Sequence, residues 1–335
     1  MVTITDVANL ARVSPATVSR YFNNRALLRD DTAKRVEDAI KKLQFSPNPV
    51  AAGLRTKRSG MIACIIPTLN NLYYIELFSA IQRRCTQHGY SLCMYSIEED
   101  SDILRKLTES MSEYQFEGVI ICYLDEPQVI PTLLELQQRI PIVLLTASAE
   151  REQFSTVCLD AYTATYNTTK YYISKGYKHI GFVSGGYENN LRIIISEKLR
   201  GYEKAVADAG LASMFSAPRG NLAAEAADGL TAGVLGAQHL MSGAVKPEAI
   251  VCTLDIVALG CVRYLREQGY RVPEDVEVAG FSGSTLTDVY APYISSIVQP
   301  LDSIAASAVR FLVEQIRDPY APKKTKRFDA VLRTF

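Results

Sequence analysis

The first 58 residues contain two short helical segments that a tight turn separates, and this arrangement constrains the chain more than any other feature. Thr3 is placed to cap the first segment, and Asp6 stands three residues later to complete a capping box. Ser14 is placed to cap the second segment, and Pro15 then takes the first helical position, where its missing N–H costs nothing. Two helices joined in this way predict a helix-turn-helix, whose second helix enters the major groove of DNA.

A third helix is predicted after this pair, and the three helices are expected to share a small apolar core. Asp30 and Asp31 stand in the first turn of the third helix, where negative charge favours the helix dipole. We assign Phe22 to the core and expect its neighbour Tyr21 to reach a DNA phosphate. The predicted core residues recur at helical spacing and are Val7, Ala8, Leu10, Ala11, Val18, Phe22, Val36, Ala39, Ile40 and Leu43.

Charge is divided unevenly along a chain that is neutral overall. Residues 1–58 hold eleven Lys plus Arg against five Asp plus Glu, so this end carries a net charge of +6 and the remainder −6. A basic end suits contact with phosphate, and an acidic body does not. The charge distribution therefore favours a DNA-binding head over a helical bundle that has no partner.

The same residues resemble the N-terminus of the LacI/GalR family of bacterial transcription regulators. The resemblance continues weakly to the end of the 335-residue chain. It implies an N-terminal all-α helix-turn-helix head joined by a hinge helix to an α/β two-lobed periplasmic-binding-protein-like domain. The matching residues are Thr3, Ile4, Asp6, Val7, Ala8, Val13, Ser14, Thr17, Val18, Ser19, Arg20, Asn23, Thr32, Val36, Phe45, Pro47, Asn48, Ala51 and Leu54.

The family resemblance also implies a function. It indicates a repressor of a carbohydrate or related catabolic operon that binds a palindromic operator in double-stranded DNA as a homodimer. A small molecule bound between the two lobes would control it. The alternative is a regulator, either repressor or activator, that a protein coregulator controls in place of a small ligand.

Beyond about residue 60, short apolar runs alternate with amphipathic segments, which is typical of a parallel sheet covered on both faces. Gly89-Tyr90, Gly176-Tyr177 and Gly269-Tyr270 each lie between a helical stretch and a strand, so each glycine is placed for a left-handed C-cap. The recurrence predicts βαβ units in two similar halves. The predicted strands are Met61–Ile66, Ser91–Tyr95, Gly118–Cys122, Ile142–Leu145, Val157–Asp160, His179–Ser184, Ala249–Cys252 and Val276–Phe281.

We therefore expect three parts along the chain. Residues 1–46 would form the helix-turn-helix head, 47–59 the hinge helix and linker, and 60–335 the effector-binding and dimerisation domain. Within that domain, the first lobe is expected at about 60–160 plus 292–320. The second lobe is expected at about 161–291 plus the C-terminal segment.

The residues expected to contact DNA lie in the first two helices and in the hinge segment. Arg20 is the best candidate for reading a base, because bidentate arginine–guanine pairing is the commonest specific contact. The alternative for Arg20 is a phosphate contact, which positions a protein without specifying sequence. In the family, a leucine at the Leu54 position wedges into the minor groove when the hinge folds on DNA. The full set is Thr3, Ser14, Pro15, Ala16, Thr17, Ser19, Arg20, Asn23, Ala51 and Leu54.

The residues expected to bind the effector come from the ends of predicted strands. By resemblance, Asp160 matches a frequent ligand-binding aspartate, and Asp255 matches the aspartate of an Asn-Asp pair whose asparagine is Leu254 here. Ser282 replaces a second family aspartate, and Lys198 replaces an arginine. The loss of groups that pair sugar hydroxyls favours an anionic or aromatic effector, such as a phosphorylated sugar or a glycoside. The full set is Tyr73, Tyr74, Tyr123, Asp160, Arg192, Lys198, Arg200, Asp255 and Ser282.

Other classes of protein are weakly supported. The nearest catalytic motif, Gly280-Phe281-Ser282-Gly283-Ser284, lacks the last glycine of a nucleophile elbow, so we expect no enzyme. The seven cysteines form no CxxC pair and lie in apolar segments, which predicts buried reduced thiols. Only His88, His179 and His239 are present and none pairs with a cysteine at ligand spacing, so we expect no metal, and we expect no cofactor. No apolar run could cross a membrane and no secretion segment opens the chain, which predicts a bacterial cytoplasmic, nucleoid-associated protein without a membrane partner.

Overall fold

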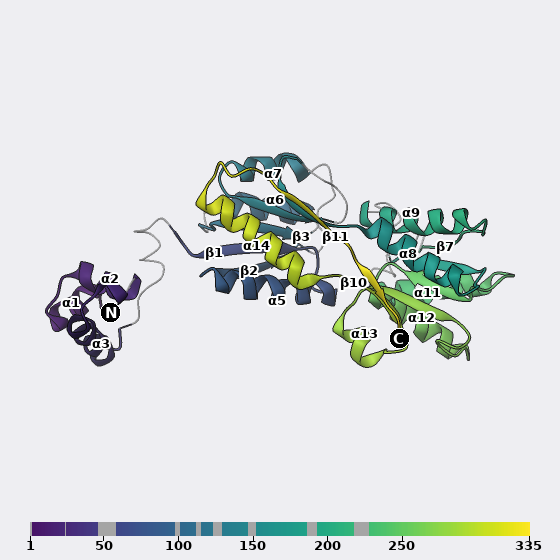
Figure 1. The fold of residues 1–335 in the computed structure, drawn as a ribbon, viewed down its shortest axis with the longest axis horizontal. Helices are drawn as coiled ribbons and strands as arrows, with labels where there is room; N and C mark the ends of the chain where they lie inside the picture. Colours follow the sequence, from purple (N-terminus) through teal and green to yellow (C-terminus); the bar gives the residue numbers. More distant parts are fainter. Residues whose placement is uncertain are drawn as a thin grey trace. The chain divides into compact units, whose positions relative to one another are not determined.

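The computed structural model describes the chain in two compact units, Met1–Ser59 and Gly60–Phe335 (Figure 1). The described residues are 2–23, 25–45, 58–97, 101–111, 115–122, 129–146, 152–185, 193–217 and 228–335. Most of the predicted hinge, including Ala51 and Leu54, lies outside these ranges, as do Tyr123 and Arg192.

The first unit is a three-helix head made of α1 (Ile4–Ala11), α2 (Pro15–Asn23) and α3 (Asp30–Leu43), with the short 3-10 helix η1 (Arg25–Leu27) between the last two. The predicted capping box is confirmed, because the Thr3 hydroxyl accepts from the Asp6 N–H and the Asp6 carboxylate accepts from the Thr3 N–H. Arg12 ends α1 in the left-handed conformation, which turns the chain into α2. The buried core consists of Val7, Ala8, Ala11, Val18, Val36 and Ala39.

Two aromatic assignments in the head were reversed. Phe22 is 40% exposed, whereas Tyr21 packs against the head's core. Neighbouring residues on a helix point about 100° apart, so only one of the pair can face the core. Leu10, also predicted as core, is 42% exposed on the outer side of α1.

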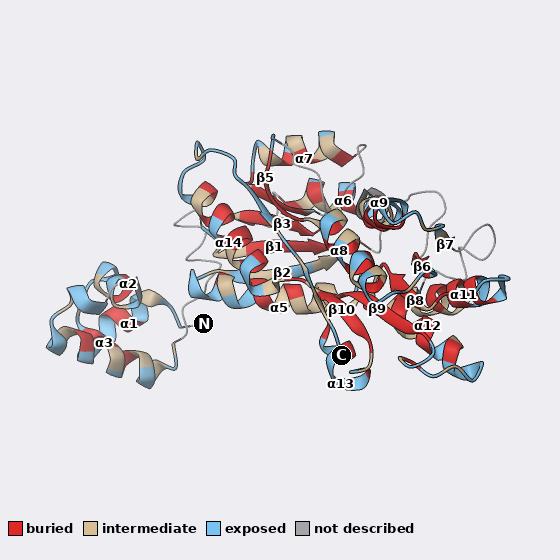
Figure 2. Cartoon of the chain, turned by 45° about the vertical axis from the view of Figure 1, so that its right-hand side comes forward, coloured by how far each residue is buried: buried red, intermediate tan, exposed pale blue. Residues whose placement is uncertain are grey.

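In the second unit, two six-stranded sheets each carry helices on both faces (Figures 1 and 2). The first lobe is built on the sheet with strand order β11-β5-β4-β3-β1-β2, which is parallel throughout. Helices α5 (Leu72–Gln87) and α14 (Leu301–Arg317) pack on one face, and α6 (Ser101–Met111) and α7 (Ile130–Gln137) on the other. The strands are Met61–Ile66 (β1), Ser91–Ser96 (β2), Gly118–Cys122 (β3), Ile142–Thr146 (β4), Ser155–Leu159 (β5) and Thr325–Phe328 (β11).

The second lobe is built on the sheet with strand order β12-β10-β9-β8-β6-β7, in which only β12 runs antiparallel to its neighbour. Helices α11 (Gly229–Ser242) and α12 (Asp255–Glu267) contribute to one core, and α8 (Ala161–Ser174) and α9 (Ile193–Asp208) to the other. A short helix, α13, spans Thr285–Tyr290. The strands are Ile180–Val183 (β6), Met214–Ser216 (β7), Ala249–Cys252 (β8), Glu277–Ser282 (β9), Ser295–Val298 (β10) and Val331–Arg333 (β12).

The chain passes between the two sheets three times, from β5 to α8, from β10 to α14, and from β11 to β12. Two of our lobe limits therefore need correction. Residues 295–298, which we placed in the first lobe, form β10 of the second sheet, and β11 of the C-terminal segment joins the first sheet. The passages share a small buried cluster that includes Leu159, Phe281 and Ile297. The sequence did not reveal these passages because the pairing partner of a strand lies far from it in the chain.

The recurring Gly-Tyr pairs do mark helix ends. Gly89, Gly176 and Gly269 have φ values of +81°, +93° and +85°, the left-handed conformation predicted for them.

Six of the seven cysteines are buried and Cys93 is half-buried, and all seven are free thiols. Within the described ranges, no helix combines the length and apolar character that crossing a membrane requires.

Candidate DNA-binding face and effector site

Helix α2 presents one exposed polar face. Ser14, Pro15, Ala16 and Arg20 are exposed, and Thr17 is half-buried. The Ser14 hydroxyl accepts a hydrogen bond from the Thr17 N–H at 3.2 Å, which confirms the predicted cap. This cap fixes the first turn of α2, after which Val18 and Ser19 are buried and Arg20 is exposed.

Arg20 is the cation of this face, in the last turn of α2. In the part of the chain that the structure describes, no carboxylate lies within ion-pair distance of its guanidinium. Arg25, by contrast, pairs with Glu37 at 3.2 Å and lies over the Tyr21 ring at 5.4 Å. Because Tyr21 is held in this cluster, the expected phosphate contact by Tyr21 is not supported. Arg20 is available to a negatively charged or base-edge partner.

The remaining residues that were predicted to contact DNA differ in their exposure and contacts. Thr3 is exposed, but its hydroxyl donates to the Asp6 carboxylate at 2.7 Å as part of the capping box. Ser19 is 9% exposed and belongs to the buried side of α2. Asn23 ends α2, but the structure does not describe its side chain. Ala51 and Leu54 lie outside the described residues.

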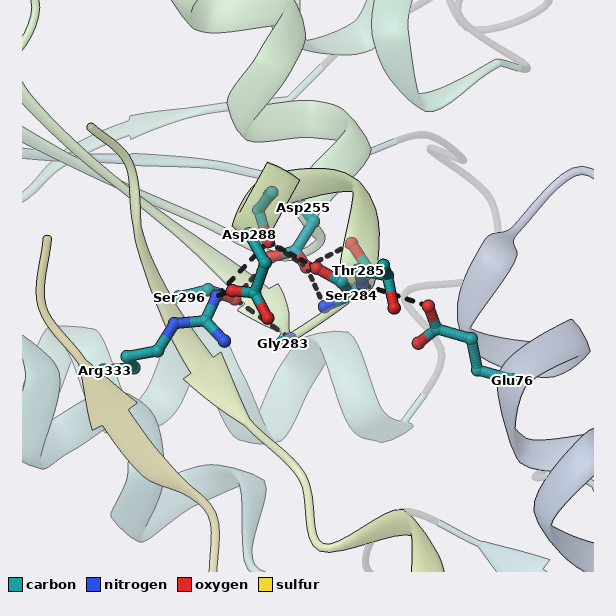
Figure 3. Close-up of polar contacts among 9 residues, drawn as sticks. Glu76, Asp255, Gly283, Ser284, Thr285, Asp288, Ser296 and Arg333 are labelled. Atoms are coloured by element: carbon teal, nitrogen blue, oxygen red, sulfur yellow. Dashed lines mark hydrogen bonds and ion pairs between the residues drawn. The ribbon is translucent and has the colours of Figure 1, made fainter. Parts of the chain in front are cut away.

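Asp255 is the most highly connected of the effector candidates (Figure 3). Its side chain is 4% exposed, at the start of α12. Oδ2 accepts from the Ser284 N–H at 2.7 Å and from the Ser284 hydroxyl at 2.8 Å, and Oδ1 accepts from the Ser296 hydroxyl at 2.5 Å. A carboxylate has about four acceptor positions, so most of its capacity is used within the chain. The arrangement makes Asp255 an anchor for the segment around Ser284.

The segment that Asp255 holds has an unusual backbone. Ser282 ends β9 with φ +143°, and Gly283 follows with φ +68°. A Cβ on Gly283 would lie 2.8 Å from Val298 Cα, so only glycine fits there. The Gly283 N–H donates to the Ser296 hydroxyl at 3.0 Å. Ser282 itself is 5% exposed, at the carboxyl end of its strand.

Lys198 is the buried cation of the same lobe. It is 2% exposed; its Nζ donates to the Thr253 carbonyl at 2.7 Å and lies 3.5 Å from the centroid of the Phe281 ring. Burial lowers the pKa of Lys198 to about 7, and the nearby Asp255 charge opposes this shift. Within the described residues, no carboxylate lies within 4.0 Å of Nζ. This is a site where an added anion would stabilise the ammonium form.

Lys198, Asp255 and Ser282 therefore lie together at the carboxyl ends of β8 and β9, where open α/β sheets bind ligands. Arg200 does not join them. It is exposed on the surface of α9, pairs with Glu197 and lies over the Tyr162 ring at 5.7 Å.

The first-lobe candidates have structural roles of their own. Tyr73 and Tyr74 open α5, pack edge to face at 5.2 Å and contact the buried core of that lobe. Burial raises the pKa of Tyr73 above its ordinary value, so it stays neutral at physiological pH. Asp160 caps α8 by accepting from the Thr163 N–H at 2.9 Å.

Glu76, which lies on α5 close to the two tyrosines, was not among the predicted site residues. Its Oε1 accepts a hydrogen bond at 3.0 Å from the N–H of Thr285, the first residue of α13 in the second lobe (Figure 3). Ser284 and Ser296, the partners of Asp255, were not predicted either. A lone carboxylate in the second turn of a helix forms no pattern that points to a contact with the other lobe.

Comparisons with known proteins agree on both units. Residues 3–48 match the family model for bacterial regulatory proteins of the lacI family. Residues 59–333 match the model for periplasmic binding proteins and the sugar binding domain of the LacI family.

The relatives cover almost the whole chain. Catabolite control protein A from Priestia megaterium is 31% identical over 314 residues, which is 93% of this chain and 92% of that protein. The HTH-type transcriptional repressor PurR from Aliivibrio fischeri is 28% identical over 321 residues, covering 95% and 93%.

Among solved structures, the Lac repressor bound to ONPG in its repressed state superposes with a TM-score of 0.81 at 22% identity, covering 99% of this chain and 98% of that one. The complex of the regulator CelR with cellobiose gives a TM-score of 0.70 at 23% identity, covering 100% and 99%. These likenesses show the fold.

Proposed function

Because the chain belongs to the LacI family of bacterial regulatory proteins, we propose that it is a repressor that binds a palindromic operator as a homodimer. Each chain carries one recognition helix, α2, which reads one half-site, so a pair of chains matches a twofold-symmetric operator. The proposed target is a carbohydrate or related catabolic operon. The relatives PurR and the Lac repressor are named as repressors, which supports this direction of regulation.

The observation that carries the proposal is the exposed face of α2, on which Arg20 has no carboxylate within ion-pair distance in the described head. An exposed arginine on a recognition helix suits a bidentate contact with guanine. Ala16 and Pro15, on the same face, suit contact with a thymine methyl group. The net charge of +6 over residues 1–58 adds the phosphate attraction that such a contact needs.

The hinge and domain limits are part of this proposal. Residues 47–59 would fold as a hinge helix on the operator, with Ala51 and Leu54 facing the minor groove and Leu54 inserted into it. An inserted leucine opens one base step and bends the duplex. Residues 60–335 would bind the effector and form the dimer.

A small molecule is proposed to bind where Lys198, Asp255 and Ser282 meet, opposite the start of α5. The buried Lys198 ammonium favours a ligand that brings negative charge, such as a phosphorylated sugar, since the described residues give it no carboxylate partner. A glycoside with an aromatic group is the other ligand within the proposal, because the half-buried Tyr73 and Tyr74 supply ring surfaces. Asp255 would not contact such a ligand directly. It would position the segment around Ser284, which it anchors.

A second candidate is control by a protein coregulator. It is favoured by one observation, namely that most of the Asp255 acceptor capacity is used by Ser284 and Ser296. An occupied carboxylate has little left for the hydroxyls of a neutral sugar.

Selection from a random duplex library tests the operator proposal. The full chain should enrich a twofold-symmetric sequence and bind it at least a thousandfold more tightly than random duplex, the order of specificity that such proteins show. Failure to enrich any sequence would refute the proposal.

A further inference from the structure

The N-terminus of α13 is capped from outside its own lobe. Ser284 stands at the N-cap position of α13 but makes no side-chain capping bond, and its hydroxyl donates to Asp255. The first N–H of the helix, that of Thr285, donates instead to Glu76 Oε1 at 3.0 Å. A helix leaves its first N–H groups without internal partners, so a carboxylate at this place is a favourable acceptor.

Helix α13 is fixed firmly to the second lobe. Asp255 holds its first residues through Ser284, as described above. Near its end, Asp288 pairs with Arg333 of β12, an ion pair visible in Figure 3. Both ends of α13 therefore contact residues of the second lobe, so the helix belongs to that lobe.

Glu76 is fixed in the same way to the first lobe. On α5, its neighbour Leu77 is 1% exposed, and Ala80 and Ile81 one turn later are also buried in the first lobe's core. Thr285 thus belongs to the second lobe and Glu76 to the first. The hydrogen bond between them therefore depends on the distance between α5 and α13.

We infer that Glu76 is a positioning residue that couples the two lobes, by capping α13 only when the lobes take the arrangement seen here. The inference rests on the proposed function, in which two lobe arrangements differ in operator affinity. An effector shifts such an equilibrium only by its difference in affinity for the two arrangements. The Glu76–Thr285 hydrogen bond would shift the same equilibrium, because it forms in only one of the two lobe arrangements. It lies beside the proposed ligand position.

Hydrogen exchange of the free full-length protein tests the inference. We compare the wild type with Glu76→Ala, with Glu76→Gln, which keeps an oxygen acceptor, and with Gln82→Ala, a control at an exposed position of the same helix. In peptides spanning 283–291, Glu76→Ala should speed exchange of the Thr285 amide about fivefold, the effect of losing one hydrogen bond. Glu76→Gln should show a smaller increase, and Gln82→Ala none.

Small-angle scattering supplies the second readout. Glu76→Ala should raise the radius of gyration of the free protein, because the second arrangement becomes more populated, and Gln82→Ala should leave it unchanged. Equal exchange and equal scattering in Glu76→Ala and the wild type would overturn the inference. Both measurements omit DNA, so they decide the role of Glu76 even if the wild type selects no operator. That last result would refute the proposed repressor alone.

Discussion

The ammonium group of Lys198 lies 3.5 Å from the centroid of the Phe281 ring, in the interior of the second lobe. An aromatic face attracts a cation, but it replaces only part of the hydration that burial removes. The carbonyl of Thr253 supplies one further acceptor at 2.7 Å. This incomplete replacement is the reason that the pKa falls to about 7, and it makes Lys198 sensitive to pH in the physiological range.

Stability should depend on pH through this lysine. The ordinary pKa is 10.5 and the folded value about 7, so between these values the unfolded chain holds a proton that the folded chain lacks. The free energy of unfolding therefore rises with pH from about 7 to 10.5, by at most about 1.4 kcal/mol per pH unit. Below pH 7 both states hold the proton, so the full cost of the buried ammonium is present and this pH dependence disappears. Urea unfolding at pH 6, 7, 8 and 9 should show this rise in the wild type relative to Lys198→Met. Parallel curves would contradict the burial of a titrating lysine.

Effector binding should carry the opposite pH dependence. An anion binds the ammonium form of Lys198, so its affinity should fall as pH rises above 7, approaching tenfold per pH unit. Calorimetry with neutral monosaccharides and their phosphates at pH 6 and 8 checks this, with Lys198→Met as the variant that lacks the charge. Tight binding of an unphosphorylated monosaccharide, equal at both pH values, would exclude the anionic effector.

Arg20→Ala should abolish discrimination between operator and random DNA. The lost contact with a base edge amounts to about 1–3 kcal/mol of specific binding. Arg25→Ala is the matched control, since that guanidinium pairs with Glu37 and lies off the exposed face of α2. Fluorescence anisotropy with both duplexes gives the specificity ratio. If Arg20→Ala weakens both duplexes equally, Arg20 contacts phosphate and does not read the sequence.

Leu54→Ala should weaken operator binding without changing the melting temperature of the free protein. The side chain is proposed to insert between base pairs, so the fold without DNA should not depend on it. Leu69→Ala, at a 49% exposed leucine of the first lobe, serves as the control and should leave operator binding intact. A large drop in melting temperature for Leu54→Ala would place this leucine in a core.

Asp255→Ala should destabilise the second lobe. It leaves the Ser284 N–H and the Ser296 hydroxyl without their acceptor, at about 1–3 kcal/mol for each buried group. The comparison is Asp288→Ala, which breaks a half-exposed pair with Arg333 and should cost less than about 1 kcal/mol. Denaturant titration of both variants measures the difference. Similar small losses would mean that Asp255 is not an anchor.

Local patterns predicted local structure well. Thr3 with Asp6, and Ser14 ahead of Pro15, marked helix starts because a capping bond joins residues only three apart. The Gly-Tyr pairs marked helix ends because glycine takes the left-handed conformation there without steric cost. The eight predicted strands all correspond to strands of the two sheets, within one or two residues at most ends.

The parts that escaped prediction depend on contacts between distant residues. Nothing local distinguishes Phe22 from Tyr21, and the choice is made by how α2 packs against α1 and α3. Strand β10 joins the second sheet because it pairs with β9, which its own four residues do not encode. Asp255 was recognised by its motif, but its partners Ser284 and Ser296 come from elements 29 and 41 residues away.

Hydroxyl-radical footprinting on the selected duplex, with the number of bound chains counted in the same sample, tests the central claim most directly. We predict two protected stretches related by a twofold axis, with their centres about one helical turn apart, and two chains per duplex. A single protected stretch, an asymmetric pattern or one chain per duplex would contradict the account of a dimeric repressor that reads a palindrome with α2.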